Sequence, residues 1–116
     1  MFSLVNENGE TIESDSGERG LLLFYGDTVC DDSFSDNSAD AICREMGYAL
    51  GADSWEYGQF YDIQSSFDIG LDNVACSSDS WDSCTFTTSH NCAHSEDVHL
   101  ACATEGDNSY SCNKFL

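Results

Sequence analysis

The chain has 116 residues, which is enough for one domain with a modest hydrophobic core. It carries 22 acidic residues against three Lys or Arg, for a formal net charge of −19. This charge argues against nucleic acid as a partner, because phosphate neutralisation requires basic side chains. No apolar run approaches the roughly 18 residues of a membrane helix, and the start of the chain lacks the basic and apolar parts of a signal peptide. We therefore expect no membrane insertion. The chain is expected to be a mature form, an excised domain or a cytosolic protein.

Seven cysteines in a chain of this length favour an oxidised protein. The alternative is a zinc site. Structural zinc sites normally use closely spaced Cys-x-x-Cys pairs, whereas the closest cysteines here are separated by seven residues. The spacing therefore favours disulfides, and with them a secreted, extracellular or cell-surface location.

Two strands are predicted in the first 30 residues. Phe2, Leu4 and Val5 start the first strand. The apolar run at 21–25 predicts a second, buried strand, and Gly-Asp at 26–27 supplies a tight turn after it.

Residues 36–47 form the clearest predicted helix. Apolar side chains recur there at helical spacing and define one buried stripe. The stripe consists of Ala39, Ile42, Cys43 and Met46. Three polar residues can cap the start of this helix, namely Asp36, Asn37 and Ser38. Gly47 is expected to end it.

Residues 49–70 are rich in aromatic side chains and are expected to contain little regular structure. These rings are expected to be mostly core, although exposed ones would form a ligand surface. They are Trp55, Tyr57, Phe60, Tyr61 and Phe67. A short strand or extended turn follows at 71–76, and the loop between Cys76 and Cys84 suits a local disulfide.

The segment 91–102 connects a loop to a strand. Val98, Leu100 and Cys102 alternate with His99 and Ala101, which predicts a half-buried strand with Cys102 toward the core. The domain is expected to span residues 1–103. A polar C-terminal tail with one further cysteine is expected at 104–116.

Four blocks of sequence then stand together in order. They read Gly-Asp-Thr-Val-Cys-Asp-Asp at 26–32, Asp-Ala-Ile-Cys-Arg-Glu-Met-Gly-Tyr at 40–48, Leu-Asp-Asn-Val-Ala-Cys at 71–76, and Asn-Cys-Ala-His-Ser-Glu-Asp-Val at 91–98. In combination they closely resemble the scavenger receptor cysteine-rich domain, over about residues 2–103. The resemblance implies an α+β fold in which a curved antiparallel sheet, stapled by disulfides, cradles one helix.

The cysteines resemble those of the six-cysteine subtype of this family. Position 48 is Tyr where the eight-cysteine subtype has a cysteine, and the segment before the strand at 21–25 also lacks one. Six cysteines allow 15 pairings, and the resemblance selects one of them. It implies the bonds Cys30–Cys92, Cys43–Cys102 and Cys76–Cys84. Cys112 has no counterpart and is expected to be free, capped, or bonded to another chain in a disulfide dimer.

A cation site is predicted where two of these cysteines would meet. Asp31 and Asp32 follow Cys30, and Glu96 lies four residues after Cys92. If the two cysteines are bonded, the three carboxylates are brought close together, and a cation would relieve their repulsion. Oxygen ligands select Ca²⁺, or Mg²⁺ as the alternative. Members of the resembled family bind calcium with these motif positions and sometimes at a second site. Weaker candidates for that second site are Asp72, Asn73 and Asp40. The alternative is a solvated acidic surface.

No enzymatic activity is expected. His94, Ser95, Glu96 and Asp97 include the residue types of a hydrolase, but adjacent residues cannot converge as a triad. His94 is expected to form structural hydrogen bonds instead. The sequence thus predicts an extracellular, non-catalytic, calcium-dependent binding module for a protein or cationic ligand. Two alternatives stay open. One is an acidic calcium- or mineral-associated matrix protein, and the other is a purely structural interaction module.

Overall fold

The computed structural model describes residues 1–13 and 16–104. Its seven strands are β1 (Phe2–Val5), β2 (Gly20–Phe24), β3 (Asp27–Val29), β4 (Ala52–Tyr57), β5 (Ile69–Cys76), β6 (Cys84–Thr87) and β7 (Val98–Cys102). Its helix is α1 (Asp36–Glu45), and three 3₁₀ turns are η1 (Asp62–Ser66), η2 (Trp81–Ser83) and η3 (His94–Glu96). Apart from Thr104, the predicted tail at 104–116 lies outside the described residues, and so does Cys112.

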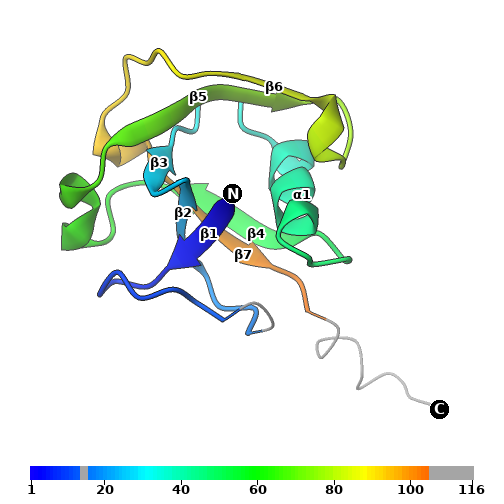
Figure 1. Ribbon diagram of the computed structural model, residues 1–116, viewed down its shortest axis with the longest axis horizontal. Coiled ribbons are helices and arrows are strands. Elements are labelled where there is room, and N and C mark those ends of the chain that lie inside the picture. The colour runs from blue at the N-terminus through cyan, green and yellow to red at the C-terminus, as the bar shows by residue number, and fades with distance from the viewer. Residues whose placement is uncertain (14–15, 105–116) are drawn as a thin grey trace.

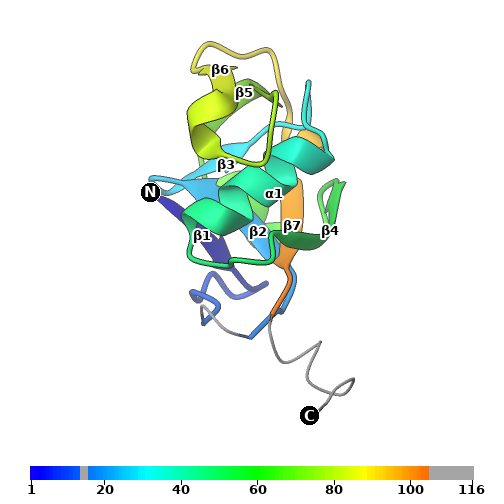
Figure 2. The same ribbon diagram turned by 90° about the vertical axis from the view of Figure 1, so that its right-hand side faces the viewer.

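The strands form one sheet in the order β4-β7-β2-β3-β5-β6, with β1 paired to β2. The sheet curls, so that in Figure 1 β5 and β6 run across the top of the molecule while β4 and β7 cross its centre, to the left of α1. Figure 2, seen from the side of the helix, shows α1 seated across the opening of this curl. The expected combination of one helix and a curved sheet is confirmed. The sheet is mixed rather than purely antiparallel, because β3 and β5 run parallel.

Strand β2 is buried on both faces, which explains its unbroken run of leucines. Leu22 packs into the main core between the sheet and α1. Leu21 and Leu23 point the other way and form a second cluster with Val5. Tyr61 and Phe67, from the segment around η1, cover this second cluster. The segment around η1 therefore covers the face of β2 that points away from α1.

The same segment contains a strand that the sequence did not predict. β4 pairs antiparallel with β7 along its length, from Ala52 opposite Cys102 to Tyr57 opposite Val98. Its polar, partly exposed sequence lacks the apolar alternation by which a strand is recognised. Because β4 and the loop after it cover β7, all five residues of β7 are buried, so the expectation of a half-buried strand was wrong.

Helix α1 begins at Asp36, the first residue of the predicted range, but its cap is one to three residues earlier than the three predicted candidates. Ser35 is the N-cap residue, and its backbone N–H donates to the Ser38 hydroxyl at 3.2 Å. The stripe residues Ala39, Ile42 and Cys43 are fully buried, as the helical spacing indicates. No helix in the described part of the chain is long and apolar enough to span a membrane.

Three disulfides staple these elements. They join Cys30 to Cys92, Cys43 to Cys102, and Cys76 to Cys84, which are the pairs that the resemblance implies. The first two close loops with sequence separations of 62 and 59 residues. In the chain-entropy model, bonds that close such long loops stabilise a fold by about 4 kcal/mol each.

Candidate cation site beside the Cys30–Cys92 disulfide

The Cys30–Cys92 disulfide holds the segment around η3 against the end of β3. Next to the bond, the Asp31 N–H donates to the Glu96 carbonyl at 2.9 Å, and Cys30 forms an isolated β-bridge with Asp97. Two acidic stretches that are 64 residues apart in the chain, at 31–32 and at 96, thereby become neighbours.

Two carboxylate pairs lie at this disulfide. The first joins Asp31 to Glu96 and the second joins Asp32 to Asp72, with oxygens within 4.8 Å of each other and of the Cys30 sulfur. The sulfurs are bonded to each other, so they are not thiolate ligands and the candidate donors are oxygens. No group of described residues brings Asp31, Asp32 and Glu96 all within this distance. The three predicted carboxylates are thus divided between two adjacent pairs, and Asp72 is the fourth carboxylate, which completes the second pair.

The second pair includes a carboxylate that is almost removed from solvent. Asp72 is 3% exposed, and its Oδ1 accepts the N–H of Asn73 at 2.8 Å. Asn73 itself is exposed and has a positive φ of 56°. Asp40 belongs to another part of the molecule, where its carboxylate accepts the Ala52 N–H at 2.8 Å.

The pairs are electrostatically unfavourable when both members are ionised. Burial raises the pKa of Asp31, and repulsion from Asp32, Glu96 and Asp72 raises it further. The pKa of Asp32 is also raised, by desolvation and then by its interaction with Asp72. Both basic side chains within residues 1–13 and 16–104 pair with acids elsewhere, Glu56 and Asp79. The site therefore presents oxygens that lack a counter-charge, which is the donor chemistry that Ca²⁺ prefers.

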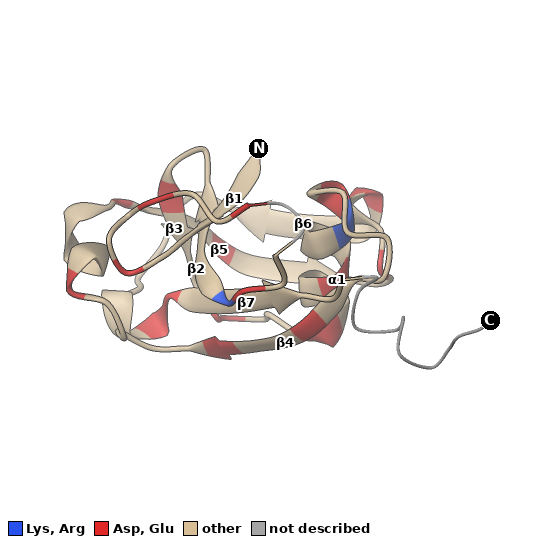
Figure 3. Ribbon diagram, turned by 90° about the horizontal axis from the view of Figure 1, so that it is seen from below, with Lys and Arg blue, Asp and Glu red and all other residues tan. Residues whose placement is uncertain are grey.

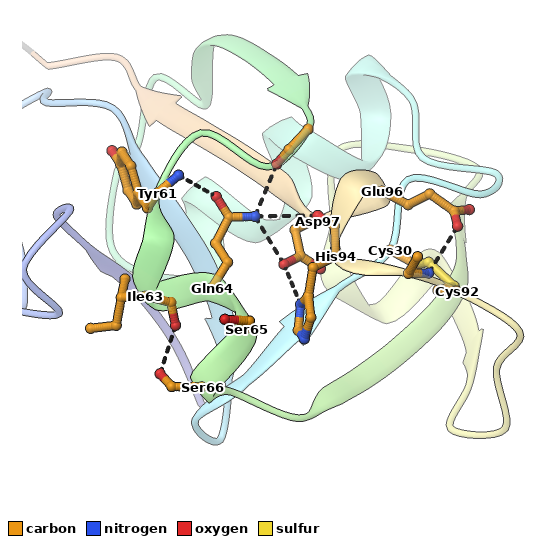
Figure 4. A network of polar contacts seen from close by, with 12 residues as sticks. Cys30, Tyr61, Ile63, Gln64, Ser65, Ser66, Cys92, His94, Glu96 and Asp97 are labelled. Carbon is orange, nitrogen blue, oxygen red and sulfur yellow. Dashed lines mark hydrogen bonds and ion pairs between the residues drawn. A yellow bond between two sulfur atoms is a disulfide. The ribbon is translucent and has the colours of Figure 1, made fainter.

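Behind the site lies a buried polar network that the sequence reasoning missed (Figure 4). Gln64 and Asp97 are completely buried, and His99 is 1% exposed. The Gln64 Nε2 donates to the Asp97 Oδ2 at 3.1 Å and to the carbonyls of Gly58 and His94 at 3.0 and 3.2 Å. The network thus joins the β4–η1 loop to the segment that carries Glu96.

The hydrogen-bond partners in this network determine the orientation of the Gln64 amide and the position of the proton on His99. The Gln64 Oε1 accepts the N–H groups of Phe60 and Tyr61 at 2.8 and 2.9 Å, which identifies it as the oxygen. The His99 Nε2 lies 3.0 Å from this oxygen and 3.2 Å from the Gly58 carbonyl, so it must carry a proton. Burial lowers the pKa of His99 to about 4, so the ring is neutral at physiological pH.

His94 has the structural role that the sequence predicts. Its Nδ1 lies 2.8 Å from the Asp97 Oδ2 and, facing a carboxylate, acts as the donor. The sequence held one signal of this network, an acid and a histidine three residues apart at a strand entrance. Gln64 gave no signal, because it joins the loop before it to a segment that lies 30 or more residues away in the chain.

Acidic residues are spread along the described chain, in the loops, in α1 and in β4, rather than gathered in one segment (Figure 3). The two basic residues of the described part are Arg19 and Arg44. Arg19 pairs with Glu56, and the Arg44 Nε lies 3.3 Å from an Asp79 oxygen. Within residues 1–13 and 16–104, no basic patch is therefore available for a polyanion.

Comparison with known proteins identifies this architecture. The family model of the scavenger receptor cysteine-rich domain matches residues 13–103. The chain belongs to this family. Its six bonded cysteines agree with the six-cysteine subtype.

Two curated relatives share this domain. The macrophage receptor MARCO of Mus musculus is 37% identical over 81 residues, which is 66% of this chain and 14% of the receptor. Lysyl oxidase homolog 2 of Bos taurus is 37% identical over 86 residues, which is 66% of this chain and 10% of that protein. The chain therefore spans about one seventh or less of either relative, and the oxidase in the second name describes that protein.

Solved structures show the same fold. The third domain of this family in murine neurotrypsin superposes with a TM-score of 0.58 and 28% identity, covering 88% of this chain and 94% of that one. The dimeric form of the mouse MARCO domain gives a TM-score of 0.50 and 28% identity, covering 74% and 87%.

Proposed function

We propose that this chain is an extracellular, non-catalytic ligand-binding module whose binding depends on calcium. Membership in the scavenger receptor cysteine-rich family supports the binding role, as does the word receptor in the name of the relative MARCO. The three disulfides support an oxidising, extracellular location. Protein or cationic ligands suit a surface with this charge, and calcium would bridge to carboxylates on the partner.

The calcium proposal rests on one observation, the two carboxylate pairs that lie beside Cys30. Asp31, Asp32, Asp72 and Glu96 would supply the oxygens, and Asn73 follows Asp72 in the sequence. A bound cation would neutralise the repulsion that raises the pKa values of Asp31 and Asp32. The disulfide positions these acids before the ion arrives, so little chain entropy is lost on binding.

A calcium titration separates this proposal from its alternatives. We expect one or two defined sites with a Kd on the order of 10⁻⁴ to 10⁻³ M, as in other extracellular modules. Many weak, indistinguishable sites would instead favour an acidic matrix protein. The absence of any binding would leave a structural interaction module.

Polyanion binding provides a second test. Because both described basic residues are paired with acids, heparin should bind negligibly in EDTA. Heparin binding that appears only with calcium would agree with a calcium-bridged ligand. Tight heparin binding in EDTA would contradict the proposal.

A further inference from the structure

Aromatic rings form a continuous series of contacts from the core to the solvent at one end of the molecule. This end is formed by β1, the β2–β3 turn, η2 and β6. Phe2, 5% exposed, lies at its base and packs edge-on against Trp81, with ring centroids 4.9 Å apart. Phe24 and Trp81 are half-buried above it. Phe86 stacks on Trp81 with centroids 5.6 Å apart, and Tyr25 meets Phe24 edge-on at 4.7 Å. Phe24, Tyr25, Trp81 and Phe86 are called the aromatic surface below.

The two outermost rings are exposed although they contact other rings. Tyr25 is 74% exposed and Phe86 is 40% exposed. Phe86 projects from β6, the last strand of the sheet order, whose residues after Cys84 are all exposed. At this end of the molecule the hydrophobic core ends at Phe2, Phe24 and Trp81. Tyr25 and Phe86 lie outside it, so the core does not require them. Connected, exposed aromatic rings of this kind are typical of interaction surfaces.

The backbone at Tyr25 adds an independent observation. Phe24 pairs with Asp27, so Tyr25 and Gly26 form a two-residue hairpin turn, and both have a positive φ, 51° and 86°. Such turns favour Asn, Asp or Gly at the first position, because a bulky side chain is strained there. The chain therefore holds an exposed tyrosine where the turn itself would favour a smaller residue. Local strain at an exposed side chain points to a role outside folding.

The charges around the aromatic surface indicate its occupant. Asp27 lies directly opposite Phe24 in the β2–β3 pairing, and the exposed Asp82 follows Trp81 in η2. The two basic residues of the described chain are engaged by Glu56 and Asp79. Aromatic faces attract cations, and guanidinium groups stack on them while pairing with carboxylates. A second copy of this chain is opposed by the repulsion between two formal charges of −19.

From these observations we propose that the aromatic surface binds an arginine-bearing basic segment of a protein partner. The arginine side chains stack on Tyr25, Phe86 and Trp81, and Asp27 and Asp82 pair with their charge. This surface needs no calcium. It is therefore a second binding surface beside the one proposed above, and experiments in EDTA distinguish the two.

The test uses a peptide of alternating arginine and glycine with its neutral citrulline counterpart, titrated by calorimetry in EDTA at about 0.1 M salt. The arginine peptide should bind and the citrulline peptide should not. Phe86→Ala and Tyr25→Asn should each weaken binding about two- to fivefold, the size of an exposed cation–π contact. Phe60→Ala and Tyr57→Ala remove rings that are each 55% exposed elsewhere, and should leave binding unchanged.

Tyr25→Asn also separates binding from folding. Asparagine suits a positive φ, so this variant should melt at the same or a higher temperature than wild type while binding more weakly. In a Trp55→Phe background, the fluorescence of Trp81 should change when the arginine peptide is added. Equal losses in the control variants, or no loss in Tyr25→Asn and Phe86→Ala, would show that the peptide responds only to net charge and would overturn the proposal. An unchanged Trp81 signal would do the same.

Discussion

Glu96 and Asp97 are neighbours in the chain, and their carboxylates lie in opposite environments. Asp97 is completely buried and receives hydrogen bonds from Gln64 and His94. Glu96 is partly exposed, accepts one backbone N–H from Ala93 at 3.0 Å, and faces the carboxylate of Asp31. One acid is thus supplied with donors by the protein, whereas the other is placed against a like charge.

The difference shows which acids hold the fold and which are available for a ligand. Burial raises the pKa of Asp97, and the hydrogen bonds that its Oδ2 accepts from His94 and Gln64 lower it again. At Asp31, burial and three acids raise the pKa, and only its own backbone hydrogen bond acts the other way. The Asp97 Oδ2 accepts hydrogen bonds from two side chains of the protein, while the carboxylate of Asp31 would gain from an external cation.

Removal of the Cys30–Cys92 disulfide, which holds the segment of Glu96 and Asp97 in place, should lower the stability of the fold most. Cys30→Ala with Cys92→Ala should lower the free energy of unfolding by about 4 kcal/mol in the chain-entropy model and abolish defined calcium binding. Cys76→Ala with Cys84→Ala removes a bond between cysteines only eight positions apart, and should cost about 2–3 kcal/mol. Denaturant unfolding of both variants measures the difference. Intact calcium binding without Cys30–Cys92 would contradict the role of this bond in positioning the acids.

Asp97→Ala should cost about 2–4 kcal/mol, because it removes a fully buried carboxylate that accepts hydrogen bonds from both Gln64 and His94, and it leaves the His94 Nδ1 without this acceptor. Asp97→Asn is the matched control. Its oxygen can accept the same bonds, and its amide can donate to the Thr28 hydroxyl, which is buried without a partner, as is the Asp97 Oδ1. Denaturant unfolding should therefore show a smaller loss for Asn than for Ala. Equal losses would show that the charge of Asp97, rather than its hydrogen bonds, stabilises the network.

Acidification should weaken the fold through His99. Its pKa is lowered to about 4 in the folded state, so below its ordinary value of 6.5 the unfolded chain binds the proton more readily. Stability should be fully present above pH 6.5 and fall toward pH 4, with a slope of at most about 1.4 kcal/mol per pH unit for one proton. His99→Gln should flatten this slope in unfolding measured across pH. An unchanged slope would assign the pH dependence to other groups.

Asp31→Asn should have opposite effects with and without calcium. A carboxyl whose pKa is raised by folding destabilises the folded state once it ionises, so the cost is absent in strong acid and complete above the raised pKa. At pH 7 in EDTA, removal of this charge should raise the melting temperature. In millimolar calcium the variant should lose the stabilisation that wild type gains. A lower melting temperature in EDTA would show that Asp31 is a structural acid like Asp97.

The sequence predicted the parts of the fold whose patterns are local. The burial of β2 follows from its continuous apolar run, and the buried stripe of α1 follows from helical periodicity. The disulfide pairs, by contrast, came only from the resemblance to the family. Strand β4 was missed because its pairing with β7 is set by distant residues, and its own side chains are mostly polar.

The candidate site divides in the same way. Asp31, Asp32 and Glu96 were predicted as a single cluster because they flank two cysteines. Their separation into two pairs depends on Asp72, whose burial follows from the pairing of β5 with β3 and could not be inferred from spacing. The network around Gln64 could not be predicted for a related reason, since its amide joins two segments that are 30 or more residues apart in the chain.

Calorimetric calcium titration of three proteins tests the central claim most directly. Glu96→Gln removes one charge at the proposed site, and Glu45→Gln removes one charge from an exposed position at the end of α1. Wild type and Glu45→Gln should bind calcium equally, with a stabilisation of about 0.4–1.4 kcal/mol at millimolar calcium. Glu96→Gln should lose most of the binding heat. If all three proteins bind alike, or none binds, the acids at Cys30–Cys92 are not a calcium site.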